Sequence, residues 1–89
     1  MKDDYIFYKN IKELDLHGCD RYDATIKVEG FILENYKLGN KYVAIIHGKG
    51  TGILRKVVHS ILKKNKYISN YKLDLFNTGI TIVELKKLK

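Results

Sequence analysis

The sequence predicts a single α/β domain with the element order βαβαββ. Apolar residues recur at helical spacing in two stretches, 24–36 and 53–62. A continuous apolar run with β-branched members lies between them at 42–46. Shorter stretches near both ends of the chain alternate between apolar and polar residues, as half-buried strands do. A chain of 89 residues is long enough for one apolar core, so we expect one domain and one site.

The first strand is expected over 13–17, where two leucines alternate with polar residues. The alternation puts Asp15 and His17 on the same face of this strand. The residues before the strand show no lasting periodicity. We therefore expect an N-terminal arm over 1–12 and the folded domain over 13–89.

The first helix is expected over about 21–37, with Asp20 as its N-cap. Gly39 suits the left-handed residue that follows a helix end. The apolar run 42–46 then predicts a strand that is central in its sheet or covered on both faces.

The second helix follows a glycine-rich turn, and Thr51 is its expected cap. An apolar stripe on this helix is expected to pack against the sheet. The polar residues of the helix lie on its other sides: Arg55, Lys56, His59 and Lys63. We therefore expect a basic outer face, with His59 on the surface rather than in a site.

The last two strands are expected over 68–75 and 80–85, joined by a turn at 77–79. A strand–helix–strand unit of this length makes a right-handed crossover with its two strands parallel. Ligands of open α/β sheets bind at the carboxyl ends of such strands. His17 and His47 fall at these two ends, so we expect them to share a pocket.

The turn after the second strand has the composition of a phosphate-binding loop. It joins a strand to a helix N-terminus, where glycines allow close approach of an anion and backbone N–H groups favour negative charge. It matches neither the Walker loop nor the dinucleotide fingerprint, which argues against nucleoside triphosphates and NAD. Glycine-rich turns also occur for geometry alone, so both interpretations remain open. The candidate phosphate-binding residues are Gly48, Lys49, Gly50, Thr51, Gly52 and, one turn into the helix, Arg55.

Asp15, His17 and His47 are the candidate catalytic residues. Imidazoles have an ordinary pKa of about 6.5, which suits proton transfer at neutral pH. The Asp15 carboxylate could orient an imidazole, keep it protonated, or hold a divalent metal together with a histidine. For each histidine the alternative is a capped strand end, and for Arg55 it is a solvated helix cation.

Charge and cysteine content narrow the class of protein further. The net charge of +7 favours a phosphate-bearing partner, although a lysine-rich composition can also reflect genome composition. No apolar run is long enough to span a membrane, and the acidic first residues, 1–4, lack the apolar stretch that is typical of a signal peptide. Cys19 is the single cysteine and cannot form an internal disulfide, so we expect the protein to work in a reducing cytoplasm. No Cys and His set has the spacing of a structural zinc site.

Two blocks make the sequence resemble a known family. Leu14-Asp15-Leu16-His17-Gly18 and His47-Gly48-Lys49-Gly50-Thr51-Gly52, followed by Gly79 to Leu85, resemble the hallmarks of the Smr (small MutS-related) domain over about residues 13–86. The resemblance implies a two-layer α/β sandwich with a four-stranded mixed sheet, similar to the C-terminal domain of translation initiation factor 3. It also implies nucleic-acid binding and, in several members, nicking of DNA or cleavage of RNA.

The family's proposed functional positions carry over to this chain. They fall on Asp15, His17, His47, Gly48, Lys49, Gly50 and Gly52, and all are present. Two departures occur: the family often has a longer glycine-rich loop where this chain has only 76–79, and Asp23 stands where Glu is usual. A shorter loop would bind substrate more weakly or in a different shape.

The expected function is therefore an endonuclease or nicking domain that acts on RNA or structured DNA. The alternative is a non-catalytic module that binds nucleic acid or a ribosomal surface. A third hypothesis is a structural protein whose basic face binds other proteins. The resemblance implies either a stand-alone protein or the C-terminal domain of a MutS paralogue, which acts on branched DNA or collided ribosomes. The sequence does not choose between DNA and RNA or between metal-dependent and metal-free cleavage.

Overall fold

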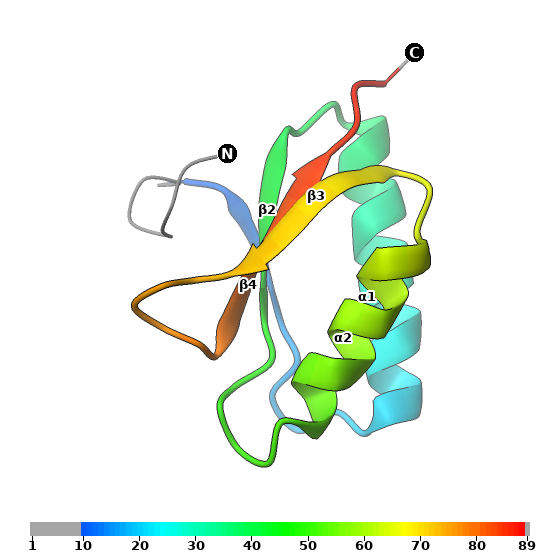
Figure 1. Ribbon diagram of the computed structural model, residues 1–89. Helices are drawn as coiled ribbons and strands as arrows, with labels where there is room; N and C mark the ends of the chain where they lie inside the picture. The colour runs from blue at the N-terminus through cyan, green and yellow to red at the C-terminus, as the bar shows by residue number, and fades with distance from the viewer. Residues whose placement is uncertain (1–9, 89) are drawn as a thin grey trace.

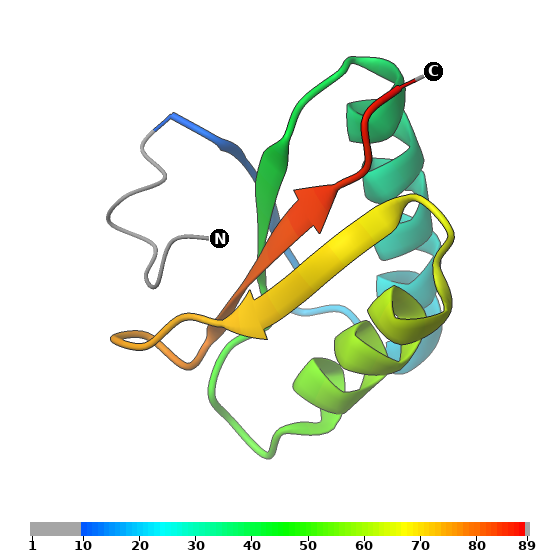
Figure 2. The ribbon, with the colours of Figure 1, turned by 45° about the horizontal axis from the view of Figure 1, so that its top comes forward.

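The computed structural model describes residues 10–88 and shows two layers, a four-stranded sheet and a pair of helices that cover one of its faces (Figures 1 and 2). The predicted order βαβαββ is confirmed. Residues 1–9, most of the predicted arm, lie outside the described residues. The elements are β1 (Lys12–Asp15), α1 (Arg21–Lys37), β2 (Tyr42–Ile46), α2 (Ile53–Lys64), β3 (Ile68–Leu73) and β4 (Ile80–Leu85).

The sheet has the strand order β1-β2-β4-β3 and is mixed. β1 and β2 are parallel, as the crossover rule predicts, and β4 runs antiparallel to both β2 and β3. Asp15 pairs with Ile46, so β1 and β2 end level with each other. The segments that follow these two strands therefore leave the sheet at the same edge.

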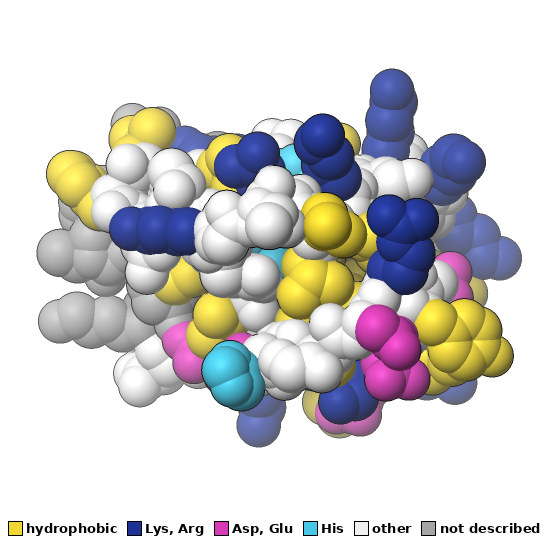
Figure 3. Space-filling view, turned by 90° about the horizontal axis from the view of Figure 1, so that it is seen from below, with side chains coloured by type: hydrophobic (Ala, Val, Ile, Leu, Met, Phe, Trp, Pro, Cys, Tyr) yellow, Lys and Arg dark blue, Asp and Glu magenta, His cyan; other side chains and the backbone are white. Residues whose placement is uncertain are grey.

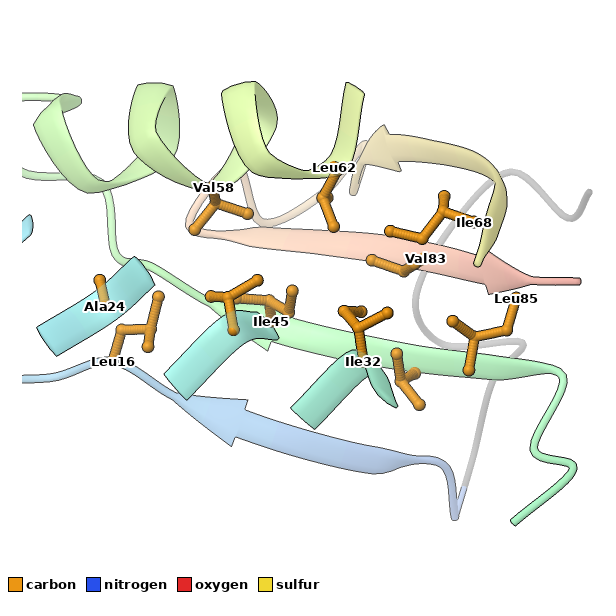
Figure 4. Close-up of a cluster of buried hydrophobic side chains, with 11 residues drawn as sticks. Leu16, Ala24, Ile32, Ile45, Val58, Leu62, Ile68, Val83 and Leu85 are labelled. Atoms are coloured by element: carbon orange, nitrogen blue, oxygen red, sulfur yellow. The ribbon is translucent and has the colours of Figure 1, made fainter. Parts of the chain in front are cut away.

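The main core lies between the sheet and the two helices (Figure 4). Val43 and Ile45 of β2 point into it, and their neighbour Ala44 belongs to a second buried cluster with Ile80 and Ile82 of β4. β2 and β4 are thus buried on both faces, which is why 42–46 reads as a continuous apolar run. The fully buried residues of the main core are Leu16, Ala24, Val28, Ile32, Val43, Ile45, Val58 and Val83.

The ends of α1 follow the prediction. The Asp20 carboxylate accepts a 2.8 Å hydrogen bond from the Asp23 N–H, which caps the first turn. At the other end Gly39 has φ +78° and donates its N–H to the Tyr36 carbonyl at 3.1 Å. These two contacts fix where the chain enters and leaves the helical layer.

Three predicted boundaries are wrong. β1 spans Lys12–Asp15 and not 13–17, so His17 lies in the turn that follows the strand and not on its face. α2 is capped by Gly52 in the left-handed conformation, with φ +84°, and not by Thr51, whose hydroxyl is 3.4 Å from the Ile53 N–H. β3 ends at Leu73 and not at residue 75, because the Asp74 carboxylate accepts N–H bonds from Phe76 and Asn77 and starts the turn to β4. Within residues 10–88, neither helix is long and apolar enough to cross a membrane.

Candidate functional site

Three loops meet at the edge of the sheet where β1 and β2 end. The β3–β4 turn is tied to the glycine-rich turn because the Gly79 carbonyl accepts N–H bonds from both His47, at 2.9 Å, and Gly48, at 3.0 Å. A Cβ on Gly79 would lie 3.2 Å from the Gly48 backbone. The absence of a side chain at Gly79 therefore lets the two turns approach closely.

The structure brings Asp15, His17 and His47 around one open hollow of about 410 Å³. β1 delivers Asp15 directly, and Gly18, with φ +79°, turns the chain immediately after His17. His47 enters from the end of β2. The rest of the lining is Gly18, Ile46, Gly48, Gly50 and Leu54.

Asp15 and His17 are the two exposed polar groups of this hollow. The Oδ1 atom of Asp15 accepts a 2.9 Å hydrogen bond from the backbone N–H of His17, which orients the carboxylate. Figure 3 views this end of the molecule, and one histidine side chain projects from the surface there. An oriented carboxylate and a free imidazole can act as a base and an acid on a bound molecule.

His47 differs from His17, because both of its ring nitrogens are engaged and only 7% of its surface is exposed. Its Nδ1 lies 3.0 Å from the Gly48 carbonyl oxygen, and its Nε2 lies 2.8 Å from the Thr81 hydroxyl oxygen. A carbonyl oxygen only accepts, so Nδ1 carries a proton. His47 thus lines the hollow as a fixed wall.

Thr81 joins two histidines. The Nε2 atom of His59 lies 2.7 Å from the same hydroxyl oxygen that bonds His47, and the two imidazoles are perpendicular with centroids 6.0 Å apart. Neutral His47, protonated at Nδ1, accepts the single Thr81 hydroxyl proton at Nε2. His59 must then donate its Nε2–H to the Thr81 oxygen. The hydrogen bonds therefore all point in one direction, from His59 through the Thr81 hydroxyl to His47 and then to the Gly48 carbonyl.

The electrostatic surroundings favour this neutral arrangement. Burial lowers the pKa of His47, the Gly48 hydrogen bond opposes this lowering, and the positive charge of Arg55 adds to it. Burial also lowers the pKa of His59, with further lowering by His47 and Arg55. The lowered pKa values favour the neutral form of both imidazoles, which is the form that these hydrogen bonds use.

A second, smaller hollow of about 180 Å³ lies over the glycine-rich turn and the start of α2. Gly48, Gly50, Thr51, Gly52 and Arg55 line it together with His47, Ile53 and Leu54. The first intrahelical bond runs from the Lys56 N–H to the Gly52 carbonyl, so earlier N–H groups of the helix point toward this hollow as at any helix N-terminus. Lys49 is exposed and lines neither hollow.

The structure corrects the prediction for His59. This residue is half-buried and bonded to Thr81, whereas we expected it on the surface. We did not single out Thr81 from the sequence, although it is the one polar residue of the apolar run 80–83, and a buried hydroxyl needs a partner.

Cys19 is half-buried against the main core and lines neither hollow. Within residues 10–88, no three His, Cys, Asp or Glu side chains gather as a metal-binding group.

The comparisons with known proteins identify the family. The family model described as the Smr domain matches residues 14–86. The chain belongs to the Smr family. The resemblance carried by the two His-Gly blocks is thereby confirmed, and the Smr match spans both blocks and every strand from β2 to β4.

The related sequences are much longer proteins that each contain a region similar to this Smr domain. It is 44% identical over 77 residues to the endonuclease MutS2 of Clostridium tetani and 49% identical over 77 residues to that of Geobacillus sp.. Each alignment covers 83% of this chain and 10% of the relative. The chain thus spans about a tenth of the length of the MutS2 proteins it matches.

Solved structures agree with the fold. The Smr domain of Thermus thermophilus MutS2 superposes with a TM-score of 0.82 at 30% identity, covering 85% of this chain and 99% of that one. YdaL, a stand-alone small MutS-related protein from Escherichia coli, superposes with a TM-score of 0.80 at 27% identity, covering 84% of this chain and 64% of that one. The predicted α/β sandwich with a four-stranded mixed sheet is therefore confirmed.

Proposed function

We propose that this Smr domain binds nucleic acid and cleaves a phosphodiester bond at the edge where β1 and β2 end. One observation carries the proposal: the oriented Asp15 carboxylate and the exposed His17 imidazole line a hollow that adjoins a glycine-rich turn at a helix N-terminus. The names of the MutS2 relatives, which are called endonucleases, agree with it.

The phosphate would lie over the glycine-rich turn. Gly48 and Gly50 are exposed and leave the backbone there open to close approach, and the N-terminus of α2 favours an anion. The Arg55 guanidinium lies over Gly52, with Nη2 only 3.2 Å from where a Cβ on Gly52 would be. Arg55 is thus placed to bind two phosphate oxygens, and exposed Lys49 adds positive charge near the turn.

Asp15 and His17 would transfer the protons. A water molecule, or the neighbouring 2′-hydroxyl in RNA, attacks the phosphorus and gives its proton to the Asp15 carboxylate. The bond between the phosphorus and the leaving sugar oxygen breaks, and this oxygen takes a proton from the protonated imidazole of His17. Each group lines the hollow and neither is buried.

His47 would act as a positioning residue in this scheme. Both of its ring nitrogens are engaged, so it holds the wall between the two hollows and does not exchange a proton with the substrate. Asp15 is also an oxygen donor of the kind that divalent cations prefer, with water and phosphate oxygens completing the ligand set. Cleavage with and without EDTA tests that possibility.

The proposal is tested by cleavage of end-labelled RNA and branched DNA. Asp15→Asn and His17→Gln are each expected to slow cleavage by about 10²-fold to 10⁴-fold, the usual contribution of a positioned acid or base. Asp23→Asn is the matched control, because Asp23 is an exposed acid on the first turn of α1 that lines neither hollow. It is expected to stay within about threefold of wild type.

Two results would contradict the proposal. If Asp15→Asn and His17→Gln cleave as fast as wild type, the activity comes from another site or a contaminating nuclease. If wild type binds these substrates but cleaves none of them, with or without added Mg²⁺ or Mn²⁺, the domain is a binding module.

A further inference from the structure

A third hollow lies between α2 and β3, away from the proposed catalytic residues. Its volume is about 440 Å³. It is lined by four cations, two aromatic rings and one hydroxyl: Arg55, Lys56, Lys63, Lys64, His59, Tyr71 and Ser60. We call it the α2–β3 groove.

The positive charge of this groove has no acidic neighbours in the sequence. No Asp or Glu occurs between Glu34 and Asp74, so every charged residue of the glycine-rich turn, α2 and β3 is Lys or Arg. Helix cations usually form pairs with acids three or four residues away, and α2 contains no acid. Figure 3 shows Lys and Arg side chains gathered along one side of the site-bearing end. The groove therefore has the charge of a polyanion-binding surface.

The rings beneath these cations are fixed. The His59 and Tyr71 rings have their centroids 5.2 Å apart, and both side chains are half-buried. The Nε2–H of His59 is donated to Thr81, so the unprotonated Nδ1 is left to accept a hydrogen bond from a donor in the groove, such as a sugar hydroxyl or a base amino group. Aromatic rings held in place beside exposed cations suit a strand with repeated phosphates and flat bases.

The groove is continuous with the catalytic site. Arg55 lines both the α2–β3 groove and the hollow over the glycine-rich turn. That hollow in turn shares His47, Gly48 and Gly50 with the hollow of Asp15 and His17. The three hollows thus form one path across the surface, from β3 past the start of α2 to the end of β1.

We propose that the α2–β3 groove binds the backbone phosphates that flank the cleaved bond in a nucleic-acid strand. The identity of the ligand rests on the proposed function, whereas the existence of a polyanion-binding groove rests on its charge and shape. The groove gives the domain contacts with several nucleotides, which the small hollow over the turn cannot supply.

The test compares two triple variants that each remove three exposed lysines. Lys56→Gln/Lys63→Gln/Lys64→Gln removes the groove lysines, and Lys37→Gln/Lys41→Gln/Lys86→Gln removes three lysines at the end of α1, before β2 and after β4 that line none of the three hollows. The probe is a labelled single strand of about 12 nucleotides, and its Kd is measured over a range of salt concentrations. The groove variant is expected to bind about 10-fold to 100-fold more weakly, with the slope of log K against log salt reduced by about 2, at about 0.7 per phosphate contact.

The control triple is expected to bind within about threefold of wild type. Equal losses in both triples would overturn the proposal, because bulk charge would then explain the binding. Poly-glutamate that competes as well as the strand would also overturn the assignment to nucleic acid. Matching urea midpoints for the two variants exclude a folding defect as the cause.

Cleavage of a dinucleotide separates this inference from the proposed function. A dinucleotide has a single phosphodiester and fills the catalytic hollow only, so the groove variant is expected to cleave it at the wild-type rate. If the wild-type protein has no cleavage activity and the two triple variants still differ in strand binding, the cleavage proposal fails and the groove proposal is supported. If wild type cleaves but the triples bind alike, the groove proposal is wrong.

Discussion

Thr81 is the residue on which the buried part of the site depends. Its hydroxyl is fully buried, bonds the Nε2 atoms of His47 and His59 at 2.8 and 2.7 Å, and has one proton to share between them. That single proton fixes the tautomer of each imidazole. A buried polar group that loses its partner is destabilising, so this contact affects both stability and site geometry.

Thr81→Val is therefore expected to lower the free energy of unfolding by about 1–3 kcal/mol, because valine keeps the shape of threonine but leaves the Nε2 atoms of buried His47 and half-buried His59 without their partner. Thr81→Ser keeps the hydroxyl and is the matched control, with a smaller loss from the missing methyl group. Urea unfolding measures both, and ¹⁵N NMR reads the tautomers of the two histidines. If Thr81→Val matches wild type in stability and in the tautomers of both histidines, the proposed direction of these hydrogen bonds is wrong.

Sequence patterns predicted part of the site at this scale. His17 and His47 each precede a glycine near a strand end, and Asp15 lies two residues before His17, so the crossover rule predicted that all three would meet at one edge of the sheet. The contact of His59 with Thr81 joins α2 to β4, 22 residues apart in the chain. No periodicity within either element specifies it, since it depends on how far α2 sits from the sheet.

At the scale of elements, the glycine-rich turn and α2 act as a unit. Gly52 ends the turn in a left-handed conformation, and this conformation starts the helix that carries Arg55 and His59. Thr51 looked like the cap because threonine is a preferred capping residue. The backbone instead turns at Gly52, where φ of +84° excludes an unstrained L side chain.

Gly52→Ala is expected to cost about 1–2 kcal/mol of stability, because alanine is strained at this φ. Its Cβ would also lie 3.2 Å from Arg55 Nη2 and push the guanidinium away, which should weaken nucleic-acid binding. Gly50→Ala is the matched control for stability in the same turn, since Gly50 has no positive φ and nothing lies within 4 Å of its added Cβ. Urea unfolding compares the stability of the two variants, and a strand-binding assay compares Gly52→Ala with wild type. Equal effects would show that the conformation of Gly52 does not matter.

The type and order of the elements were predictable because each has a clear period, and the apolar run of β2 also indicated its central position. The end of β3 was not predictable in this way, because Leu75 continues the apolar alternation of the strand. The Asp74 carboxylate has already started the turn before that residue. Leu75 is in fact exposed. A side-chain cap can therefore end a strand before its pattern ends.

At the scale of the whole molecule, the buried histidines link protonation to folding. The folded protein lowers the pKa of His47 and His59 below the ordinary value of 6.5 that the unfolded chain retains. Below pH 6.5 the unfolded state thus binds protons that the folded state does not bind. The stabilisation is fully present above this pH and is lost as the pH falls toward the folded pKa values.

The free energy of unfolding is accordingly expected to decrease from pH 7.5 to pH 5.5, near and below the ordinary value of 6.5. Urea midpoints at the two pH values measure this decrease, and an NMR titration of the imidazole Cε1–H signals assigns it to residues. Folded-state pKa values at or above 6.5 for both histidines would contradict the expected direction.

The place of β4 in the sheet sets the order in which the domain can be completed during synthesis. β4 is made after β1, β2 and β3, yet it lies between β2 and β3. While the chain emerges from the ribosome, β1, α1 and β2 can pack early, but β3 has no neighbouring strand until β4 arrives. Thr81 and Gly79 come with that last strand and its turn, so the two histidines are joined and the glycine-rich turn is anchored only in a domain whose synthesis has passed β4.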